Sequence, residues 1–444
     1  MGINPLKDMV EKRKIGIHCG IPSYCSANKL VIEAALEQAK RFTGQSVLIE
    51  ATSNQVNQDG GYTKMLPEDF KEYVYKIADR IDFDKNLIVL GGDHLGPLPW
   101  CDKPADYAME QAAILVKLCV SSGYTKIHLD TSMKLGDDPA GELSPEVVAE
   151  RGAFLYKAAE EAFEEYLISH PDAVHPVYVI GSEVPIPGGD QEEGDHVKVT
   201  TPEDFERTLV AYKKKFAELG LNDAWENIIA VVVQPGVEFG NADIHHYDRI
   251  DAARLCRSLK KYPDIVFEGH STDYQTPQSL REMVQDGIAI IKVGPALTFS
   301  LREGLFALSM MEKELIEDES KRADFMEVLE EEMLKNPKYW EKYYDGDEHK
   351  QHLSRKYGFS DRSRYYMALP EVDKAISKLF KNLDGVEIPL TMLKQYMPEQ
   401  FIKVREGGLK ATPRELVKDK VVGVIDDYNY AVMHNYMVSG IFTK

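Results

Sequence analysis

Short apolar segments alternate with amphipathic segments along the first 300 residues of the chain. Apolar runs rich in β-branched residues are typical of strands buried on both faces, and eight of them lie at residues 14–19, 46–51, 87–90, 126–129, 176–180, 228–233, 264–267 and 289–293. Between them, apolar residues recur at a spacing of three and four, which predicts helices at residues 31–40, 67–80, 106–121, 145–168, 202–219, 248–260 and 276–286. Several of these segments begin with a proline behind a hydroxyl residue, as in Ser144-Pro145 and Thr201-Pro202, which marks helix starts.

The alternation of strand and helix indicates a closed (β/α)8 TIM barrel in the α/β class over residues 1–310. An open doubly wound sheet is disfavoured, because no Gly-x-Gly-x-x-Gly follows the first strand and no Gly-x-x-x-x-Gly-Lys-Ser/Thr loop is present. After residue 310 the pattern changes to charge-rich and aromatic stretches. Short helical patterns there predict a C-terminal helical extension, residues 311–444, packed on the barrel, with helices at 312–335, 371–383, 389–395 and 414–420.

Composition and charge narrow the kinds of partner. The 444 residues carry a formal net charge of -20, which argues against nucleic acid or an anionic membrane surface, because both need a basic face. The five cysteines have no close metal-binding or redox spacing, so reduced thiols are the simpler interpretation. The sequence has no signal segment and no run of about 18 apolar residues, which predicts a soluble cytoplasmic protein.

The most informative segment, residues 87–97, is an apolar run that ends in two glycines, Asp93 and His94. Barrel chemistry gathers at the carboxyl ends of the strands, so this segment would deliver an acid and a metal ligand side by side. Alternatively, Asp93 only caps a helix and His94 is a hydrogen-bonded structural residue. His94, Glu183 and His270, which follow three different predicted strands, could converge on one divalent ion, for which zinc fits best.

Polar and small residues after the other strands form a candidate sugar-phosphate site. Polar side chains at the barrel mouth would bind the sugar: Asn54, Asp130, Ser132, Gln234, Asp273 and Lys292. The loops after the seventh and eighth strands are the usual phosphate cradle, and they contain Ser271, Gly294, Ala296 and Thr298. Arg362 and Arg364 in the extension could hold a phosphate by paired hydrogen bonds, or they could belong to an amphipathic surface that ties the extension to the barrel.

Six segments, taken in order, are similar to the GatZ/KbaZ family, the large partner subunits associated with tagatose-1,6-bisphosphate aldolase. They span residues 91–97, 128–133, 181–185, 268–273, 292–298 and 361–366. This family resembles the zinc-dependent class II aldolases, which implies a barrel in which Asp93 is the proton-transfer acid beside the zinc ligand His94. Class II aldolases place ligand histidines after strands 6 and 7, whereas this chain has Gln234 at the first place and Glu268, then His270, at the second. Simple fructose bisphosphate cleavage is therefore not expected.

Two functions from different classes remain open. Some members of the family look like 4-epimerases that interconvert fructose 6-phosphate and tagatose 6-phosphate, for which the proton carriers here would be Asp93 with Glu183 or Glu268. The bond between carbons 3 and 4 would open and close again, which is aldolase chemistry without product release. In the alternative, the chain is a non-catalytic subunit that stabilises and activates a class II aldolase. A homo-oligomer is compatible with both functions, and a kinase is disfavoured because no ATP phosphate loop is present.

Overall fold

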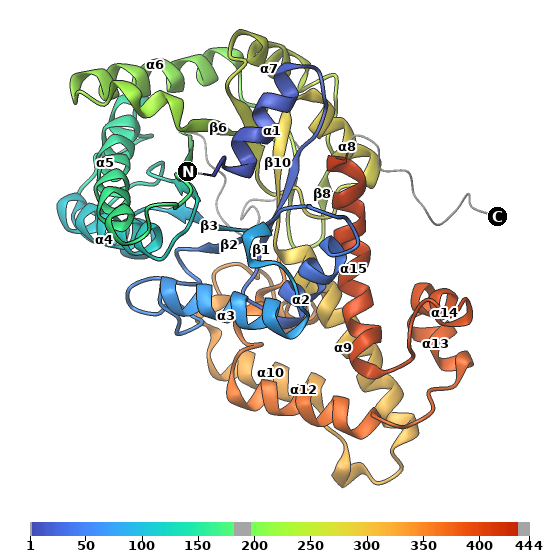
Figure 1. The fold of residues 1–444 in the computed structure, drawn as a ribbon. Coiled ribbons are helices and arrows are strands. Elements are labelled where there is room, and N and C mark those ends of the chain that lie inside the picture. Colours follow the sequence, from blue (N-terminus) through green and yellow to red (C-terminus); the bar gives the residue numbers. More distant parts are fainter. Residues whose placement is uncertain (1, 182–196, 434–444) are drawn as a thin grey trace.

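Parallel strands close into a barrel at the centre of the molecule (Figure 1). The computed structural model describes residues 2–181 and 197–433. Neighbouring strands pair in the order β1-β10-β9-β6-β5-β4-β3-β2, and β2 pairs again with β1. The barrel strands are β1 Ile21–Cys25, β2 Val47–Thr52, β3 Ile88–Leu95, β4 Lys126–Leu129, β5 Val177–Ile180, β6 Ile228–Val233, β9 Val266–Gly269 and β10 Ile288–Val293. The predicted TIM barrel is confirmed, and β7 (Glu238–Phe239) and β8 (Ile244–His245) form a separate two-stranded ribbon.

Helices follow the strands and cover the outside of the barrel (Figure 1). They are α2 Lys29–Ala39, α3 Pro67–Arg80, α4 Ala105–Ser121, α5 Pro145–Ser169, α6 Pro202–Glu218, α7 Ala253–Ser258, α8 Pro277–Asp286 and α9 Pro295–Leu315. Their starts follow the predicted signals: the Ser144 side chain accepts a hydrogen bond from the Val147 amide at the start of α5, and Thr201 accepts one from the Asp204 amide at the start of α6. Each cap satisfies an amide that the first helical turn leaves unpaired.

The prediction of the first strand at residues 14–19 is wrong. The chain begins with a helix, α1 (Pro5–Lys14), whose first turn is capped by Asn4, and the first strand, β1, lies further along. The sequence of β1 does not resemble that of a buried strand, because Pro22 lacks the amide that a central strand normally uses and Ser23 interrupts the apolar run.

Helix α1 closes the amino-terminal end of the barrel. Its buried side chains, Leu6, Met9 and Val10, share one hydrophobic cluster with barrel residues such as Val179 and Ile290. The barrel interior is therefore filled at this end by packed apolar side chains, and polar chemistry is confined to the opposite end, where the strands finish.

Further helices follow α9 (Figure 1). They are α10 Phe325–Lys335, α11 Glu348–Tyr357, α12 Pro370–Leu383, α13 Leu390–Tyr396, α14 Pro398–Arg405 and α15 Pro413–Val432. Helices α10 and α12 pack on α9, and α13 and α14 pack on each other, farther from the barrel. The predicted continuous helix over residues 312–335 is wrong, because α9 ends at Leu315 and the chain turns before α10, where the Glu312 carboxylate accepts the Ala323 amide. No proline or glycine marks this break in the sequence. Across residues 2–181 and 197–433, no helix is long and apolar enough to cross a membrane.

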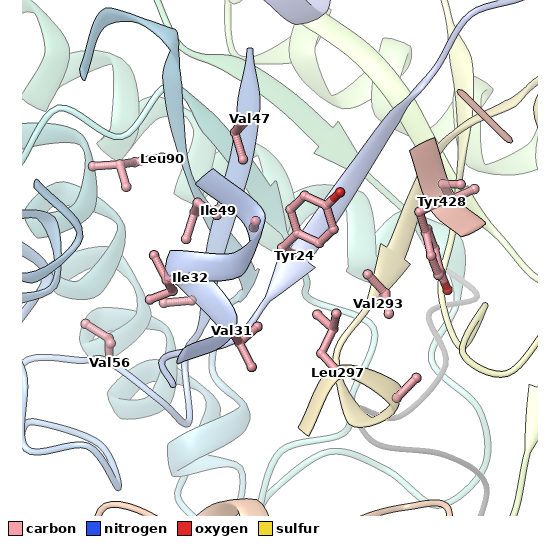
Figure 2. Close-up of a cluster of buried hydrophobic side chains, with 14 of the residues drawn as sticks. Tyr24, Val31, Ile32, Val47, Ile49, Val56, Leu90, Val293, Leu297 and Tyr428 are labelled. Carbon is pink, nitrogen blue, oxygen red and sulfur yellow. The ribbon is translucent and has the colours of Figure 1, made fainter. Parts of the chain in front are cut away.

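The last helix, α15, packs back onto the barrel against α2, α8 and α9 (Figure 1). Gly304 of α9 lies so close to α15 that a Cβ atom there would be 3.2 Å from Val417 Cα. Figure 2 shows part of the buried core on this side of the barrel, where Tyr24 of β1 and Tyr428 of α15 lie among aliphatic side chains. The Tyr428 hydroxyl donates to the Thr272 carbonyl at 2.9 Å. The extension therefore contacts a loop at the barrel mouth.

Candidate active site

Strand β3 delivers Asp93 and His94 to the carboxyl end of the barrel, and all of its residues are buried. Its two glycines are required by space, because a Cβ atom at Gly91 would meet the Glu50 side chain and one at Gly92 would meet a neighbouring leucine. The pairing with β4 shifts register after Gly92, and His94 has a left-handed backbone with φ of 46°. Such an irregularity re-aims the side chains at the end of a strand.

Three histidine side chains meet around Asp93. His94 comes from β3, His128 from β4 and His270 from the loop after β9, and their ring centroids lie 4.8 to 5.2 Å apart. One ligand atom from each histidine and one from Asp93 all lie within 4.8 Å of one another. Imidazole nitrogens with a carboxylate oxygen are a typical donor set for zinc and related divalent metals. This buried cluster could therefore hold a metal ion.

The protonation state of the histidines suits a metal. Burial and the neighbouring His94 lower the pKa of His128 to about 4, and burial lowers the pKa of His270 to about 3. Both rings are therefore neutral near neutral pH and keep a nitrogen lone pair for a metal. The Nε2 atom of His128 is buried and has no hydrogen-bond partner among the described residues. The Nδ1 atom of His128 lies 3.1 Å from the amide nitrogen of His94 and 3.0 Å from Asp93 Oδ1. In the tautomer that carries its proton on Nδ1 and donates it to Asp93, Nε2 offers a lone pair to a cation.

Two carboxylates fix the orientation of the histidine rings. Asp130 Oδ2 lies 2.7 Å from Nδ1 of His94, and Asp130 Oδ1 accepts the Ser132 hydroxyl at 2.7 Å. Glu268 Oε1 lies 2.9 Å from Nε2 of His270. Carboxylates bound to ligating histidines fix the ring tautomer and strengthen metal binding. Asp130 and Glu268 are placed to position the histidines.

Next to the histidines, two buried lysines bridge three carboxylates. Lys126 Nζ lies 2.7 Å from Glu50 and 2.9 Å from Glu268, and Lys292 Nζ contacts Asp93 and lies 3.3 Å from each of the same two glutamates. Burial alone would raise the pKa values of Glu50 and Glu268, but the surrounding positive charge, Lys126 above all, holds both well below their usual range. Three carboxylates and two ammonium groups leave a net negative charge, which favours a cation in a buried site.

A cavity at the barrel mouth opens onto this cluster and is lined by Asp93, His94 and His270. Its other walls include Asn54, Gln55 and Tyr62 after β2, Ser271, Asp273, Lys292 and Gly294 around the ends of β9 and β10, and Arg364 and Tyr365 from the extension. Arg364 and Tyr365 belong to a short 3-10 turn, Arg362–Tyr365. The extension is therefore part of the site.

A protein-family model and several relatives match nearly the whole chain. The model, described as D-tagatose-1,6-bisphosphate aldolase subunit GatZ/KbaZ-like, matches residues 6–433. The chain belongs to this family.

Two curated relatives are each named D-tagatose-1,6-bisphosphate aldolase subunit GatZ. The one from Escherichia coli (strain SMS-3-5 / SECEC) is 47% identical over 425 residues, which are 96% of this chain and 99% of the relative. The one from Klebsiella pneumoniae subsp. pneumoniae is 48% identical over 428 residues, which are 96% of this chain and 98% of the relative.

A solved structure supports the same fold for this GatZ/KbaZ-like chain. The crystal structure of a probable tagatose 6 phosphate kinase from Sinorhizobium meliloti 1021 is 44% identical in sequence and superposes with a TM-score of 0.85. The match covers 93% of this chain and 100% of that one. The barrel and its C-terminal helices are therefore shared with a protein of known structure.

The structure of this GatZ/KbaZ-like chain brings most of the predicted site residues to one place. The predicted residues that line the cavity are Asn54, Asp93, His94, His270, Ser271, Asp273, Lys292, Gly294 and Arg364. The amide of Ala296 is next to them and donates to Asp273 at 2.8 Å. Asp130 and Glu268 lie behind the histidines, in contact with His94 and His270 respectively, and the Ser132 hydroxyl donates to Asp130.

Other predicted residues lie away from the cavity. The side-chain oxygen of Gln234 accepts the amides of residues 236 and 237 and closes a turn. Thr298 lines a neighbouring cavity between α2 and α12. The guanidinium of Arg362 lies 3.3 Å from the centre of the Tyr343 ring, so this arginine joins two parts of the extension. Glu183 lies outside the described residues, and its roles as ligand and proton carrier stay predictions.

The sequence did not single out His128 or Tyr62. Lys126, His128 and Asp130 occupy every second position and therefore share one face of β4 and its end, but a histidine inside a short strand has no mark that separates a ligand from a structural residue. Tyr62 lies in the long loop after β2, where no local pattern connects it with the extension. Its ring packs 4.6 Å from that of Tyr365.

Proposed function

We propose that the chain is a metal-dependent ketohexose phosphate 4-epimerase that interconverts fructose 6-phosphate and tagatose 6-phosphate. The observation that carries this proposal is Asp93, whose carboxylate lines the cavity and also belongs to the histidine cluster. Opening a carbon–carbon bond next to a hydroxyl needs a proton acceptor and an electrophile at neighbouring atoms of the sugar. The names of the relatives, which mention tagatose 1,6-bisphosphate and tagatose 6 phosphate, support this class of sugar.

In this reaction Asp93 accepts the proton of the hydroxyl on carbon 4. The electron pair of the bond between carbons 3 and 4 moves toward the carbonyl at carbon 2, so that an enediolate and an aldehyde form and stay in the cavity. The aldehyde turns, the bond forms again on its other face, and Asp93 returns the proton to the new oxygen. A divalent metal, most suitably zinc, would supply the positive charge that polarises the ketose carbonyl. The ammonium of Lys292 contacts the Asp93 carboxylate.

The other residues hold the metal and the sugar. We assign the metal to His94, His128 and His270, because their rings surround Asp93 and those of His94 and His270 are held by carboxylates behind them. Glu268, which is buried against Lys126 and His270, then acts as a positioning residue and not as the second proton carrier. Donors on the cavity wall suit sugar hydroxyls and a phosphate: Asn54, Ser271 and Arg364.

A second candidate function is that of a non-catalytic subunit that stabilises and activates a class II tagatose-1,6-bisphosphate aldolase. The printed names of the curated relatives favour it, because each is called an aldolase subunit. The buried cluster favours catalysis, because ionised side chains with strongly shifted pKa values are costly to bury and gather mainly at functional sites.

The first experiment uses the metal-loaded protein with no other chain present. It is incubated with fructose 6-phosphate, and the hexose phosphates are separated by chromatography with and without a chelator. We expect tagatose 6-phosphate to form and its formation to stop after chelation. The Asp93→Asn variant, purified in parallel, controls for a contaminating epimerase. If the protein binds metal and forms no tagatose 6-phosphate, the proposal is wrong, and an increase in the activity of an added class II aldolase chain would then support the second function.

A further inference from the structure

The amino end of α9 is where many barrels bind phosphate, but a carboxylate of the protein occupies it here. Asp273 Oδ1 accepts the amide of Gly294 at 3.0 Å and the amide of Ala296 at 2.8 Å. These amides belong to the N-cap and the second residue of α9, which are the donors that a phosphate would use. Asp273 is 3% exposed, and it lines the cavity beside Gly294.

The position of Asp273 is fixed by its own loop. Ser271 and Tyr274, on either side, both have left-handed backbones, with φ of 51° and 63°. Thr272, between them, accepts the Tyr428 hydroxyl of α15 on its carbonyl at 2.9 Å. Backbone strain of this kind persists only where surrounding contacts hold it. The loop therefore holds the carboxylate against α9 before any substrate arrives.

We propose that Asp273 is a specificity-determining residue that replaces a substrate phosphate at α9, so that the end of the ketose bound there carries a hydroxyl group and ketose bisphosphates are excluded. This inference rests on the proposed function, because it concerns the sugar of that site. A phosphate placed at α9 would have to displace Asp273 from both amides or lie against its charge. Like charges repel strongly in a buried site, where the dielectric is low.

A negative charge at the amino end of α9 is already energetically unfavourable. Burial raises the pKa of Asp273 to about 6, even though the amides of Gly294 and Ala296 and the nearby Arg364 act in the opposite direction. A phosphate dianion placed beside this carboxylate would add to the same cost. The amino end of α9 therefore suits a neutral hydroxyl group better than a second anion.

Positive charge for a single phosphate is concentrated along the neighbouring cavity, which Asp273 does not line. Arg364 lines the site and also the neighbouring cavity between α2 and α12, together with Lys29 and Arg414. Burial and the nearby Arg80 and Arg414 lower the pKa of Lys29, as expected where positive charge is concentrated. A ketose monophosphate can therefore place its phosphate near these cations and its hydroxyl end at Asp273.

Asp273 also caps α9, so the test must separate a structural role from selection of the substrate. The neighbouring helix α8 offers a matched control, because Thr276 caps it by accepting the Ser279 amide at 3.0 Å and is not part of the cavity lining. Asp273→Ala and Thr276→Ala each remove one cap. We expect both variants to have a lower Tm and only the first to change which sugar is bound.

The experiment is equilibrium binding to the metal-loaded protein by calorimetry, with fructose 6-phosphate, fructose 1,6-bisphosphate and inorganic phosphate as probes. We expect the wild type to bind the monophosphate at least about tenfold more tightly than the bisphosphate, because like-charge contacts are strongly unfavourable. In Asp273→Ala we expect this preference to fall at least about tenfold and inorganic phosphate to bind more tightly than to the wild type. Thr276→Ala should keep the preference of the wild type.

Equal affinity of the wild type for the two sugars, or an unchanged preference in Asp273→Ala, overturns the proposal. Asp273→Asn keeps a hydrogen-bond acceptor without the charge, so it provides the same comparison if the alanine variant does not fold, and we expect it to move the preference in the same direction. The measurements record binding and not turnover, and the inorganic phosphate series needs no sugar. They therefore decide the role of Asp273 even if the proposed epimerase activity is absent.

Discussion

Asp93 belongs both to the cavity wall and to the histidine cluster, so its substitution separates proton transfer from metal binding. Asp93→Asn keeps the shape of the side chain and removes the proton acceptor. We expect kcat for fructose 6-phosphate to fall by about 10²- to 10⁴-fold, the usual contribution of a general base. The bound metal should stay near the wild-type level, because three imidazoles remain. Turnover and metal content, measured on the same preparation, test both expectations.

The matched control for Asp93 is Asp102→Asn, because Asp102 is an exposed aspartate whose partner is a surface lysine. It should leave kcat unchanged. An Asp93→Asn variant that keeps more than about one tenth of the wild-type kcat with its metal in place would exclude Asp93 as the proton carrier, because a general base contributes more than that.

His128 is the ligand that the structure adds to those predicted from the sequence. Its unpaired Nε2 atom and neutral ring lead us to expect that His128→Gln lowers metal affinity by at least about tenfold, since even the loss of a group behind a ligand costs that much. Metal per chain after dialysis against graded chelator concentrations measures the change. His175→Gln is the control, because His175 is a half-buried histidine paired with Glu160. Equal metal retention in both variants would show that His128 is structural.

At the level of elements, two helical glycines have different surroundings. A Cβ atom at Gly423 of α15 would have no neighbour within 4 Å, whereas one at Gly304 of α9 would lie 3.2 Å from Val417 Cα. We therefore expect Gly423→Ala to raise the free energy of unfolding by about 0.5–1 kcal/mol. Gly304→Leu should lower it by about 1–3 kcal/mol, as overpacking does. Urea unfolding measures both, and a stable Gly304→Leu variant would mean that the contact between α9 and α15 is loose.

The strands were predictable from the sequence where they are buried on both faces, because continuous apolar runs mark such strands. Strand β6, with the sequence Ile-Ile-Ala-Val-Val-Val, coincides with its prediction. Strand β3 continues through Gly91, Gly92, Asp93 and His94 beyond its apolar run, because its end carries the chemistry. Strand β1 was not predicted, because it contains Pro22, which is rare in central strands. Local rules fail mainly at these functional or irregular positions.

The candidate site was predictable only where a residue directly follows an apolar run, as Asp93 and His94 do. Arg362 and Arg364 show the limit of the sequence. They lie two residues apart, yet only Arg364 lines the cavity, while Arg362 packs on Tyr343. Which of them faces the barrel mouth depends on how the extension packs against a loop some 300 residues earlier, that of Tyr62. Such long-range contacts leave no local pattern.

Over the whole molecule, the buried charges connect opposite parts of the barrel. Glu50 lies on β2, Lys126 on β4, Glu268 on β9 and Lys292 on β10, and their ion pairs cross the barrel interior. A buried pair adds little net stability compared with apolar packing, but removal of one partner leaves an uncompensated charge and is strongly destabilising. The network therefore makes global stability sensitive to a single substitution and to pH.

Lys126→Met tests this network, because methionine fills a similar volume without charge. At neutral pH we expect the variant to lose about 3–5 kcal/mol of unfolding free energy, since Glu50 and Glu268 lose the nearer of the two cations that they share. In the wild type the pKa of Glu50 lies below its ordinary value of 4.5. Its carboxylate therefore adds stability above that pH, and this contribution is lost as the pH falls further. Without Lys126 the glutamates take up protons more easily, so the variant should lose less on acidification.

The difference in unfolding free energy between wild type and Lys126→Met should therefore shrink as the pH falls from about 7 to about 4 and below. Urea unfolding at a series of pH values measures it. Lys117→Met is the control, because Lys117 pairs with Glu161 on the surface at 2.9 Å, and we expect it to change stability by less than about 1 kcal/mol at every pH. A loss in Lys126→Met that does not depend on pH would assign the effect to packing. A loss that shrinks in acid assigns it to the buried carboxylates that surround the candidate metal cluster.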